Sequence, residues 1–150
     1  MKEVIVIATK EELKLISDPM FLDVPIIITG VGGTNIIKAL KDLPRDTRII
    51  NIGYAGSNVI DIGTRVDVSI CTTYHPNVDF IEPIYNLDPI KSDNVAPCYT
   101  SGDFVLQTDI KEPCVFDMEL AYICSMFDNV RSIKYVSDNL NLKNYYANIK

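Results

Sequence analysis

Short apolar segments rich in β-branched residues alternate with segments of helical periodicity along the first third of the chain. Glu3–Ala8 (EVIVIA), Val24–Thr29 (VPIIIT) and Thr47–Ile52 (TRIINI) are nearly continuous apolar runs of strand length. Such runs predict strands of a sheet that is covered on both faces. Between them lie two predicted helices, Thr9–Ile16 and Thr34–Leu43, the second with Thr34 as its N-cap. This alternation predicts a layered α/β fold.

The rest of the chain continues the alternation with weaker signals. Arg65–Cys71 (RVDVSIC) alternates polar and apolar residues, which predicts a strand with one wetter face. We predict a helix over Asp117–Phe127, a strand over Ile133–Ser137 and a short helix over Leu142–Ile149, the first with an apolar stripe of Met118, Tyr122 and Met126. Loops and short edge strands are predicted around four prolines: Pro76, Pro83, Pro89 and Pro97. Without a repeat or a linker, residues 1–150 are expected to form one domain.

Charge and cysteine content exclude several classes of function. The chain has 14 Lys and Arg against 20 Asp and Glu, a formal net charge of −6, which argues against binding to nucleic acid or to an anionic membrane surface. Its four cysteines form no C-x-x-C pair and His75 is its one histidine, so we expect no metal site. The sequence shows no signal peptide, and its longest apolar runs, such as Val4–Ala8, are too short to span a bilayer. We therefore expect a cytoplasmic protein with buried, reduced cysteines.

Two glycine-rich segments are expected to follow the carboxyl ends of strands, where α/β sheets usually bind ligands. The first is Thr29–Gly33 (TGVGG) and the second is Gly53–Ser57 (GYAGS). The first is not a dinucleotide fingerprint, because Asn35 stands where a third glycine would be needed, and neither segment has the lysine of a Walker loop. Taken alone, each segment is equally well explained as a tight turn.

Eight short motifs in order resemble one enzyme superfamily. They are Glu11-Glu12, TGVGG at 29–33, INIGYAGS at 50–57, IGTRVDVS at 62–69, Tyr74-His75, SGD at 101–103, Asp117-Met118-Glu119 and Ser137-Asp138. In this order they resemble the nucleoside phosphorylase and nucleosidase superfamily, most closely its bacterial methylthioadenosine/S-adenosylhomocysteine nucleosidase branch. The resemblance implies a three-layer α/β/α domain with a central mixed sheet. It also implies a homodimer that uses no cofactor and cleaves the N-glycosidic bond of a purine nucleoside.

The resemblance gives roles to three carboxylates. Asp138 would be the general acid that protonates N7 of the purine, Glu119 would bind the ribose hydroxyls, and Glu12 would activate the attacking water. Each also has a plainer interpretation. Asp138 could serve as a turn or N-cap aspartate, Glu119 as a first-turn residue favoured by the helix dipole, and Glu12 as a solvated helix residue.

Further positions would shape the pocket. Met118 would pack on the sugar, and Ser101 and Asp103 would shape the base pocket. The resemblance also places three residues beside the substrate: Gly32, Tyr54 and Ser137. Val105 stands where the nucleosidases stack an aromatic ring on the purine, and its neighbour Phe104 would need a change of register to replace that ring. His75 is given no catalytic role.

Two positions on the third predicted strand and just after it bear on whether water or phosphate is the nucleophile. Purine phosphorylases carry a phosphate-binding arginine where this chain has Asn51, and a serine where it has Tyr54. Water is therefore the expected nucleophile, and phosphorolysis is the weaker alternative. Tyr54, Val105 and the short segment after Asp138 favour another alternative, a non-catalytic module that binds nucleosides or serves in assembly. The chain is also shorter than typical members, and the shortened segments are those that would select the 5′ substituent.

Overall fold

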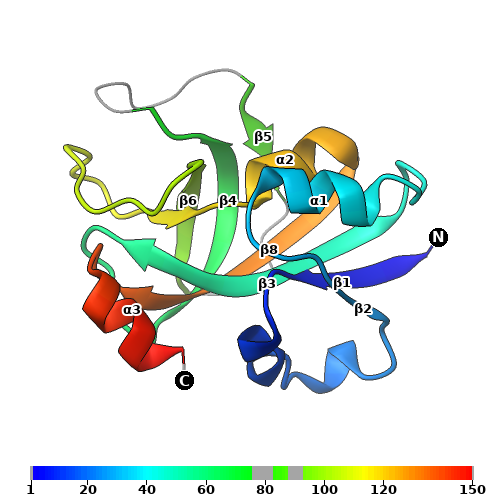
Figure 1. Ribbon diagram of the computed structural model, residues 1–150, viewed down its shortest axis with the longest axis horizontal. Coiled ribbons are helices and arrows are strands. Elements are labelled where there is room, and N and C mark those ends of the chain that lie inside the picture. Colours follow the sequence, from blue (N-terminus) through cyan, green and yellow to red (C-terminus); the bar gives the residue numbers. More distant parts are fainter. Residues whose placement is uncertain (1, 76–82, 88–92, 150) are drawn as a thin grey trace.

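The computed structural model describes residues 2–75, 83–87 and 93–149, and in this part of the chain eight strands form one mixed sheet (Figure 1). The strands are β1 (Glu3–Ile7), β2 (Ile26–Ile28), β3 (Arg48–Ser57), β4 (Arg65–Thr73), β5 (Tyr85–Asn86), β6 (Val95–Thr100), β7 (Val115–Asp117) and β8 (Asn129–Asp138). Their order is β2-β1-β3-β7-β6-β4-β5, and β8 pairs with both β3 and β4. Strands β1, β2, β3 and β8 run parallel to their neighbours in this group, whereas β8 meets β4 antiparallel.

Helices cover both faces of the sheet, which confirms the predicted three-layer arrangement. The helices are α1 (Gly33–Leu40), α2 (Leu120–Met126), α3 (Leu142–Asn148) and two 3-10 helices, η1 (Lys10–Leu15) and η2 (Pro19–Phe21). Alternate side chains of β1 enter two different cores: Val4 and Val6 pack with α1 and α2, whereas Ile5 and Ile7 pack with η1 and η2. Helix α3 lies beyond the end of β8 (Figure 1).

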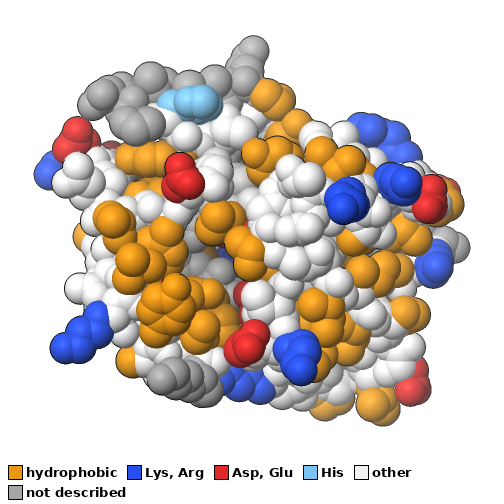
Figure 2. All heavy atoms as spheres, in the orientation of Figure 1, with side chains coloured by type: hydrophobic (Ala, Val, Ile, Leu, Met, Phe, Trp, Pro, Cys, Tyr) orange, Lys and Arg blue, Asp and Glu red, His pale blue; other side chains and the backbone are white. Residues whose placement is uncertain are grey.

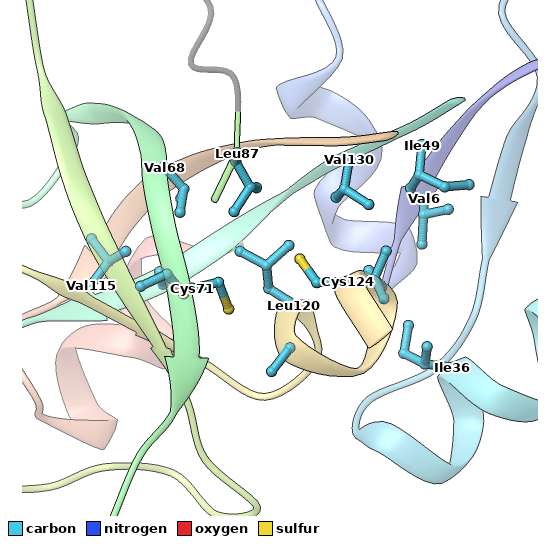
Figure 3. Packing of buried hydrophobic residues seen from close by; sticks show 14 of the residues in the cluster. Val6, Ile36, Ile49, Val68, Cys71, Leu87, Val115, Leu120, Cys124 and Val130 are labelled. Carbon is cyan, nitrogen blue, oxygen red and sulfur yellow. The ribbon is translucent and has the colours of Figure 1, made fainter. Parts of the chain in front are cut away.

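The larger core lies between α2 and the sheet. Figure 3 shows Leu120 and Cys124 of α2 among side chains from β1, β3 and β4. All four cysteines are buried and unpaired, as the sequence predicts. The predicted stripe on this helix is wrong, because the buried residues are Leu120, Ala121, Ile123 and Cys124, whereas Tyr122 is exposed. No helix in the described part of the chain is long and apolar enough to cross a membrane.

The second glycine-rich segment is not a loop. Strand β3 continues through Gly53–Ser57, where it pairs with β8 and, at Gly56 and Ser57, with β7. Glycine is a weak strand former, so the sequence pattern ends this strand too early. The backbone of this segment is hydrogen-bonded to β8 and β7, two strands that lie far from it in the sequence. A register shift between Ala55 and Gly56 marks a bulge at the end of the ladder.

Three predicted strands differ in length or setting. The second predicted strand shortens to β2 (Ile26–Ile28) at the sheet edge, where Ile26 and Ile28 are 43% and 45% exposed rather than covered on both faces. Strand β4 runs two residues further than predicted, to Thr73. Its predicted wetter face is partly confirmed: Arg65, Ser69 and Thr73 are half-buried, but Asp67 on the same face is fully buried. The segment around Pro97 is an interior strand, β6, whose register against β4 shifts at the proline. Pro76 and Pro89 lie outside the described residues.

Helix starts also differ from the predictions. The segment Thr9–Ile16 folds as the 3-10 helix η1, and α1 has Gly32 rather than Thr34 as its N-cap, with a φ of +91° that suits glycine. The predicted helix over Asp117–Phe127 begins only at Leu120, because Asp117 ends β7. The prediction of a strand over Ile133–Ser137 and of a terminal helix over Leu142–Ile149 is confirmed by β8 and α3.

Adjacent residues of α1 provide a matched test of this packing. Ile36 is 1% exposed in the larger core and Ile37 is 49% exposed. Ile36→Ala is expected to lower the free energy of unfolding by about 2–5 kcal/mol, because it leaves a cavity beneath the helix. Ile37→Ala is expected to change it by about 0.5 kcal/mol or less. Urea denaturation followed by circular dichroism measures both, and equal losses would contradict the placement of α1.

Candidate active site

Three carboxylates that are far apart in the sequence line one cavity of about 80 Å³: Glu12, Glu119 and Asp138. Glu12 comes from η1, Glu119 is the N-cap of α2, and Asp138 is the last residue of β8. Met118, Tyr54, Phe104 and Ser137 also line this cavity, which we call the carboxylate cavity. The structure therefore brings together most of the predicted site residues.

Glu12 is buried beneath the cavity rather than solvated. Only 7% of it is exposed. Its Oε1 accepts hydrogen bonds from the backbone N–H groups of Ala8 (2.8 Å) and Thr9 (3.2 Å), and its Oε2 accepts one from Tyr54 (2.7 Å). A carboxylate offers about four acceptor positions, so three backbone donors leave one position for a further partner. The interpretation of Glu12 as a solvated helix residue is wrong.

Two glycines of β3 provide the space that these carboxylates occupy. A Cβ at Gly53 would lie 2.6 Å from Oε2 of Glu12, and a Cβ at Gly56 would lie 2.8 Å from Oδ2 of Asp138. Both distances are far below van der Waals contact, so only glycine lets each carboxylate approach the strand. The glycine segment contributes to the site through its missing side chains rather than as a phosphate-binding loop.

Glu119 is held at the opposite wall of the cavity. Its Oε2 accepts a hydrogen bond of 2.8 Å from the backbone N–H of Gly32, the residue that precedes α1. Burial and the neighbouring charge of Asp117 raise the pKa of Glu119 to about 7. The Gly32 N–H and the Lys134 ammonium oppose this shift. Gly32 thus takes part in the site by orienting Glu119.

Asp138 is fully buried at the end of β8. Its Oδ1 accepts a hydrogen bond of 2.8 Å from the Ser137 hydroxyl, and its Oδ2 accepts one of 2.9 Å from the backbone N–H of Leu140. Burial raises the pKa of Asp138, although these donors partly oppose the shift. Asp138 is not the N-cap of α3, which is Asn141. Its bond to Leu140 does make it part of a turn, so the plainer interpretation holds in part.

A fully buried ion pair lies behind the carboxylates. The Nζ of Lys134 is 3.0 Å from Oδ2 of Asp117, and each side chain is 1% exposed. Asp117 also accepts hydrogen bonds from the Thr100 hydroxyl (2.6 Å) and the backbone N–H of Leu120 (2.8 Å). Burial alone would raise the pKa of Asp117, but the Lys134 ammonium and these donors lower it. Sequence reasoning gave no role to this pair.

An aromatic wall separates the carboxylate cavity from a larger groove. Phe104 borders both spaces, and its ring meets the ring of Tyr145 edge-on with centroids 5.4 Å apart. Phe104 rather than Val105 thus lines the carboxylate cavity, while Val105 packs against the cluster of Tyr99, Cys114 and Phe116 and borders the narrow hollow beside Asp138. Residues 101–114 form no helix or strand, so strand periodicity does not determine which of these two side chains reaches the cavity. Tyr145 was missed by the sequence reasoning.

Ser101 and Asp103 lie on the far side of this wall. Both line the groove, which has a volume of about 620 Å³, together with Tyr74 and Phe104. The Ser101 hydroxyl accepts a hydrogen bond of 3.2 Å from the backbone N–H of Asp103, which fixes the SGD turn. Asp103 also borders a narrow hollow that contains Asp138 and Phe104. Ser101 lines the groove and not the carboxylate cavity, but its backbone N–H donates a hydrogen bond of 2.9 Å to the carbonyl oxygen of Asp117.

The described residues suggest no metal centre. Within residues 2–75, 83–87 and 93–149, no three or more His, Cys, Asp or Glu side chains are grouped so that they could hold a metal ion. His75 is exposed and takes no part in the carboxylate cavity. Glu12, Glu119 and Asp138 of the carboxylate cavity can bind or transfer protons, and each has different hydrogen-bond donors.

Solved structures resemble this chain over nearly its whole length. MTAN from Chlamydia trachomatis has a TM-score of 0.76 at 16% identity, with 99% of this chain and 88% of that chain covered. MTA/SAH nucleosidase from Streptococcus pneumoniae has a TM-score of 0.72 at 20% identity, covering 99% and 89%. S-adenosylhomocysteine nucleosidase from Streptococcus pyogenes has a TM-score of 0.73 at 18% identity, covering 99% and 90%. The chain has the nucleosidase fold. No family model and no curated protein matches the sequence.

The nucleosidase fold explains why the motifs occur in the observed order. Glu12 and Glu119 follow strands of the sheet, Asp138 ends one, and the fold brings these three positions to one cavity. A further signal was present but unused: Lys134 precedes Asp138 by four residues on the same strand. A lysine between the apolar residues Ile133 and Tyr135 of a strand indicates a buried partner.

The space at Gly53 can be tested directly. Gly53→Ala is expected to displace the Glu12 carboxylate and to lower the free energy of unfolding by about 1–3 kcal/mol, because buried backbone donors lose their acceptor. Gly102→Ala is the control, since a Cβ there meets nothing within 4 Å. Urea denaturation measures both variants. A Gly53→Ala protein as stable as the Gly102→Ala protein would contradict the packing of Glu12 against β3.

Proposed function

We propose that this chain hydrolyses the N-glycosidic bond of a purine nucleoside or thionucleoside and releases the free base. The observation that carries the proposal is the meeting of Glu12, Glu119 and Asp138 in one cavity on a nucleosidase fold. A variant of the chlamydial MTAN is bound to MTA, and the same protein has been solved with adenine. Methylthioadenosine and S-adenosylhomocysteine are therefore the first substrates to test.

Asp138 is the general acid in this proposal. A leaving purine needs a proton at N7, and burial raises the pKa of Asp138, which favours the protonated carboxyl that can donate this proton. The hydrogen bonds from Ser137 and Leu140 fix the orientation of the carboxyl. In the narrow hollow beside Asp138, the side chains of Phe104 and Val105 offer apolar surface for the base.

Glu119 binds the ribose hydroxyls. The Gly32 N–H occupies its Oε2, so Oε1 remains available to accept hydroxyl protons. Hydrogen bonds to an ionised carboxylate are stronger than those between neutral groups. Negative charge beside the sugar also favours a transition state in which the ribose approaches an oxocarbenium ion.

Glu12 activates the nucleophile. Its one remaining acceptor position can hold a water, and the three backbone donors keep the carboxylate fixed while it receives a proton. Water is favoured over phosphate because none of the described residues that line the carboxylate cavity is Lys, Arg or His. A phosphate dianion beside three carboxylates would lack a cationic partner. The amide of Asn51 is already bonded to Ser132 and Val6.

The proposal extends to the oligomeric state of the protein. We propose a homodimer, as the resemblance to the nucleosidases implies. Apolar side chains gather over the region of α3 (Figure 2), where Leu142 and Tyr146 of this helix are 42% and 57% exposed, and they support a subunit contact there. Sedimentation velocity tests the oligomeric state, and a monomer at micromolar concentration would refute this part of the proposal.

Base release tests the reaction itself. Adenine release from methylthioadenosine and a panel of purine nucleosides is measured with and without phosphate. Asp138→Asn is expected to lower turnover by about 10²–10⁴-fold, because it removes the proton donor, while the dissociation constant for methylthioadenosine changes little. Turnover only in the presence of phosphate would refute hydrolysis. Measurable binding without release of any base would favour the non-catalytic nucleoside-binding module.

Nucleoside binding is expected to depend on pH through Glu119. Its pKa is about 7, and only the ionised carboxylate can accept both ribose hydroxyls. The affinity for methylthioadenosine is therefore highest above pH 7 and falls about tenfold per unit at lower pH. Calorimetric titration from pH 5.5 to 8.5 measures this dependence.

Two variants provide the controls for that pH dependence. Glu119→Gln is expected to bind about 10–100-fold more weakly at pH 8 and to lose the dependence, because its side chain does not titrate. Glu11→Gln, at the exposed neighbour of Glu12, is expected to behave like the unaltered protein. A pH dependence that survives in Glu119→Gln would exclude Glu119 as its source.

A further inference from the structure

Lys134 is a buried cation whose role is not explained by the reaction outlined above. It lies on β8, four residues before Asp138, with 1% of its side chain exposed, and it does not line the carboxylate cavity. An ammonium group in the interior is costly unless it is paired. Its partner, Asp117, does line the cavity and stands two residues before Glu119.

The ion pair is connected to the first turn of α2. Asp117 Oδ2 accepts hydrogen bonds from Lys134 Nζ and from the backbone N–H of Leu120. Its Oδ1 accepts the Thr100 hydroxyl proton, and the Thr100 oxygen in turn accepts the N–H of Ala121 at 3.0 Å. Lys134 thus fixes the carboxylate that holds the start of the helix, where Glu119 is the N-cap.

The charges that surround Glu119 come from every neighbouring element. Asp117 of β7 and Glu12 of η1 add negative charge around Glu119, and Asp138 of β8 and Tyr145 of α3 also line the cavity. Of these groups and Lys134, only Lys134 is positive. Burial alone would lower the pKa of Lys134, but the charges of Asp117, Glu119 and Glu12 raise it, so the ammonium stays charged.

We propose that Lys134 is a positioning residue that fixes Glu119 at the cavity wall through Asp117, and that its own positive charge favours the ionised form of the Glu119 carboxylate. This inference rests on the proposed function, in which Glu119 accepts the hydroxyls of the ribose. Lys134 would influence Glu119 without touching the nucleoside. The single positive charge offsets the mutual repulsion of the carboxylates, so that the site can present an ionised acceptor to the sugar.

The direct test measures the protonation of Glu119 in the ligand-free chain. The δ-carbon resonances of ¹³C-labelled glutamates are followed from pH 4 to 10, and Glu119→Gln identifies the signal of Glu119. In Lys134→Met the midpoint is expected to rise by about one pH unit or more, a tenfold increase in proton affinity. Lys134→Arg, which keeps the charge, is expected to restore a midpoint close to that of the unaltered chain.

A second pair of variants covers the case in which Lys134→Met does not fold because Asp117 is left as an unpaired buried charge. Asp117→Asn and the double variant Asp117→Asn/Lys134→Met differ only at Lys134, and neither contains that carboxylate. The double variant is expected to have the higher Glu119 midpoint. An equal midpoint in these two proteins, or an unchanged midpoint in folded Lys134→Met, would overturn the proposal.

Binding provides the functional readout. At pH 7 the dissociation constant of Lys134→Met for methylthioadenosine is expected to rise about tenfold, with recovery at pH 9 as Glu119 ionises. A merely structural role for Lys134 would weaken binding equally at both pH values, which would overturn the proposal. If the unaltered chain binds no nucleoside, the proposed function fails, but the carboxyl titration still decides whether Lys134 controls the charge of Glu119.

Discussion

The buried ion pair between Lys134 and Asp117 is the constraint on which the arrangement of the site depends. Two charges withdrawn from water are costly, and removing one partner of such a pair costs about 3–5 kcal/mol. The pair forms only when β7 and β8 lie in the same sheet and α2 begins directly after β7. The bonds of Asp117 to Thr100 and Leu120 add β6 and the first turn of α2 to the same network. Satisfying one buried charge therefore fixes four elements.

The carboxylates above this pair occupy space that β3 leaves empty. Gly53 and Gly56 have no Cβ, and the oxygens of Glu12 and Asp138 approach the strand where a side chain would otherwise stand. Each carboxylate is then held by backbone N–H groups from neighbouring segments, so its position depends on the backbone and little on flexible side chains. A short 3-10 helix and a turn can therefore position Glu12 and Asp138 without a long helix.

The three carboxylates differ because their surroundings differ. Glu12 accepts three backbone donors, Glu119 accepts one and faces the charge of Asp117, and Asp138 is fully buried with two donors. Burial raises the pKa of the last two, and the value of about 7 for Glu119 suits a group that changes its charge near neutral pH. In the proposed reaction, this separation of environments assigns one carboxylate to the base, one to the sugar and one to the water.

The sequence by itself determined the layered α/β class, the approximate places of β1, β8 and α3, and the identity of the three carboxylates, because these depend on local periodicity and on short motifs in a fixed order. Only the tertiary structure decided that β3 runs through its glycines and that Phe104 rather than Val105 lines the carboxylate cavity. It also decided that Lys134 and Asp117 meet. Strand pairing, loop register and burial of a charge depend on partners distant in the chain, and local sequence patterns carry no record of those partners.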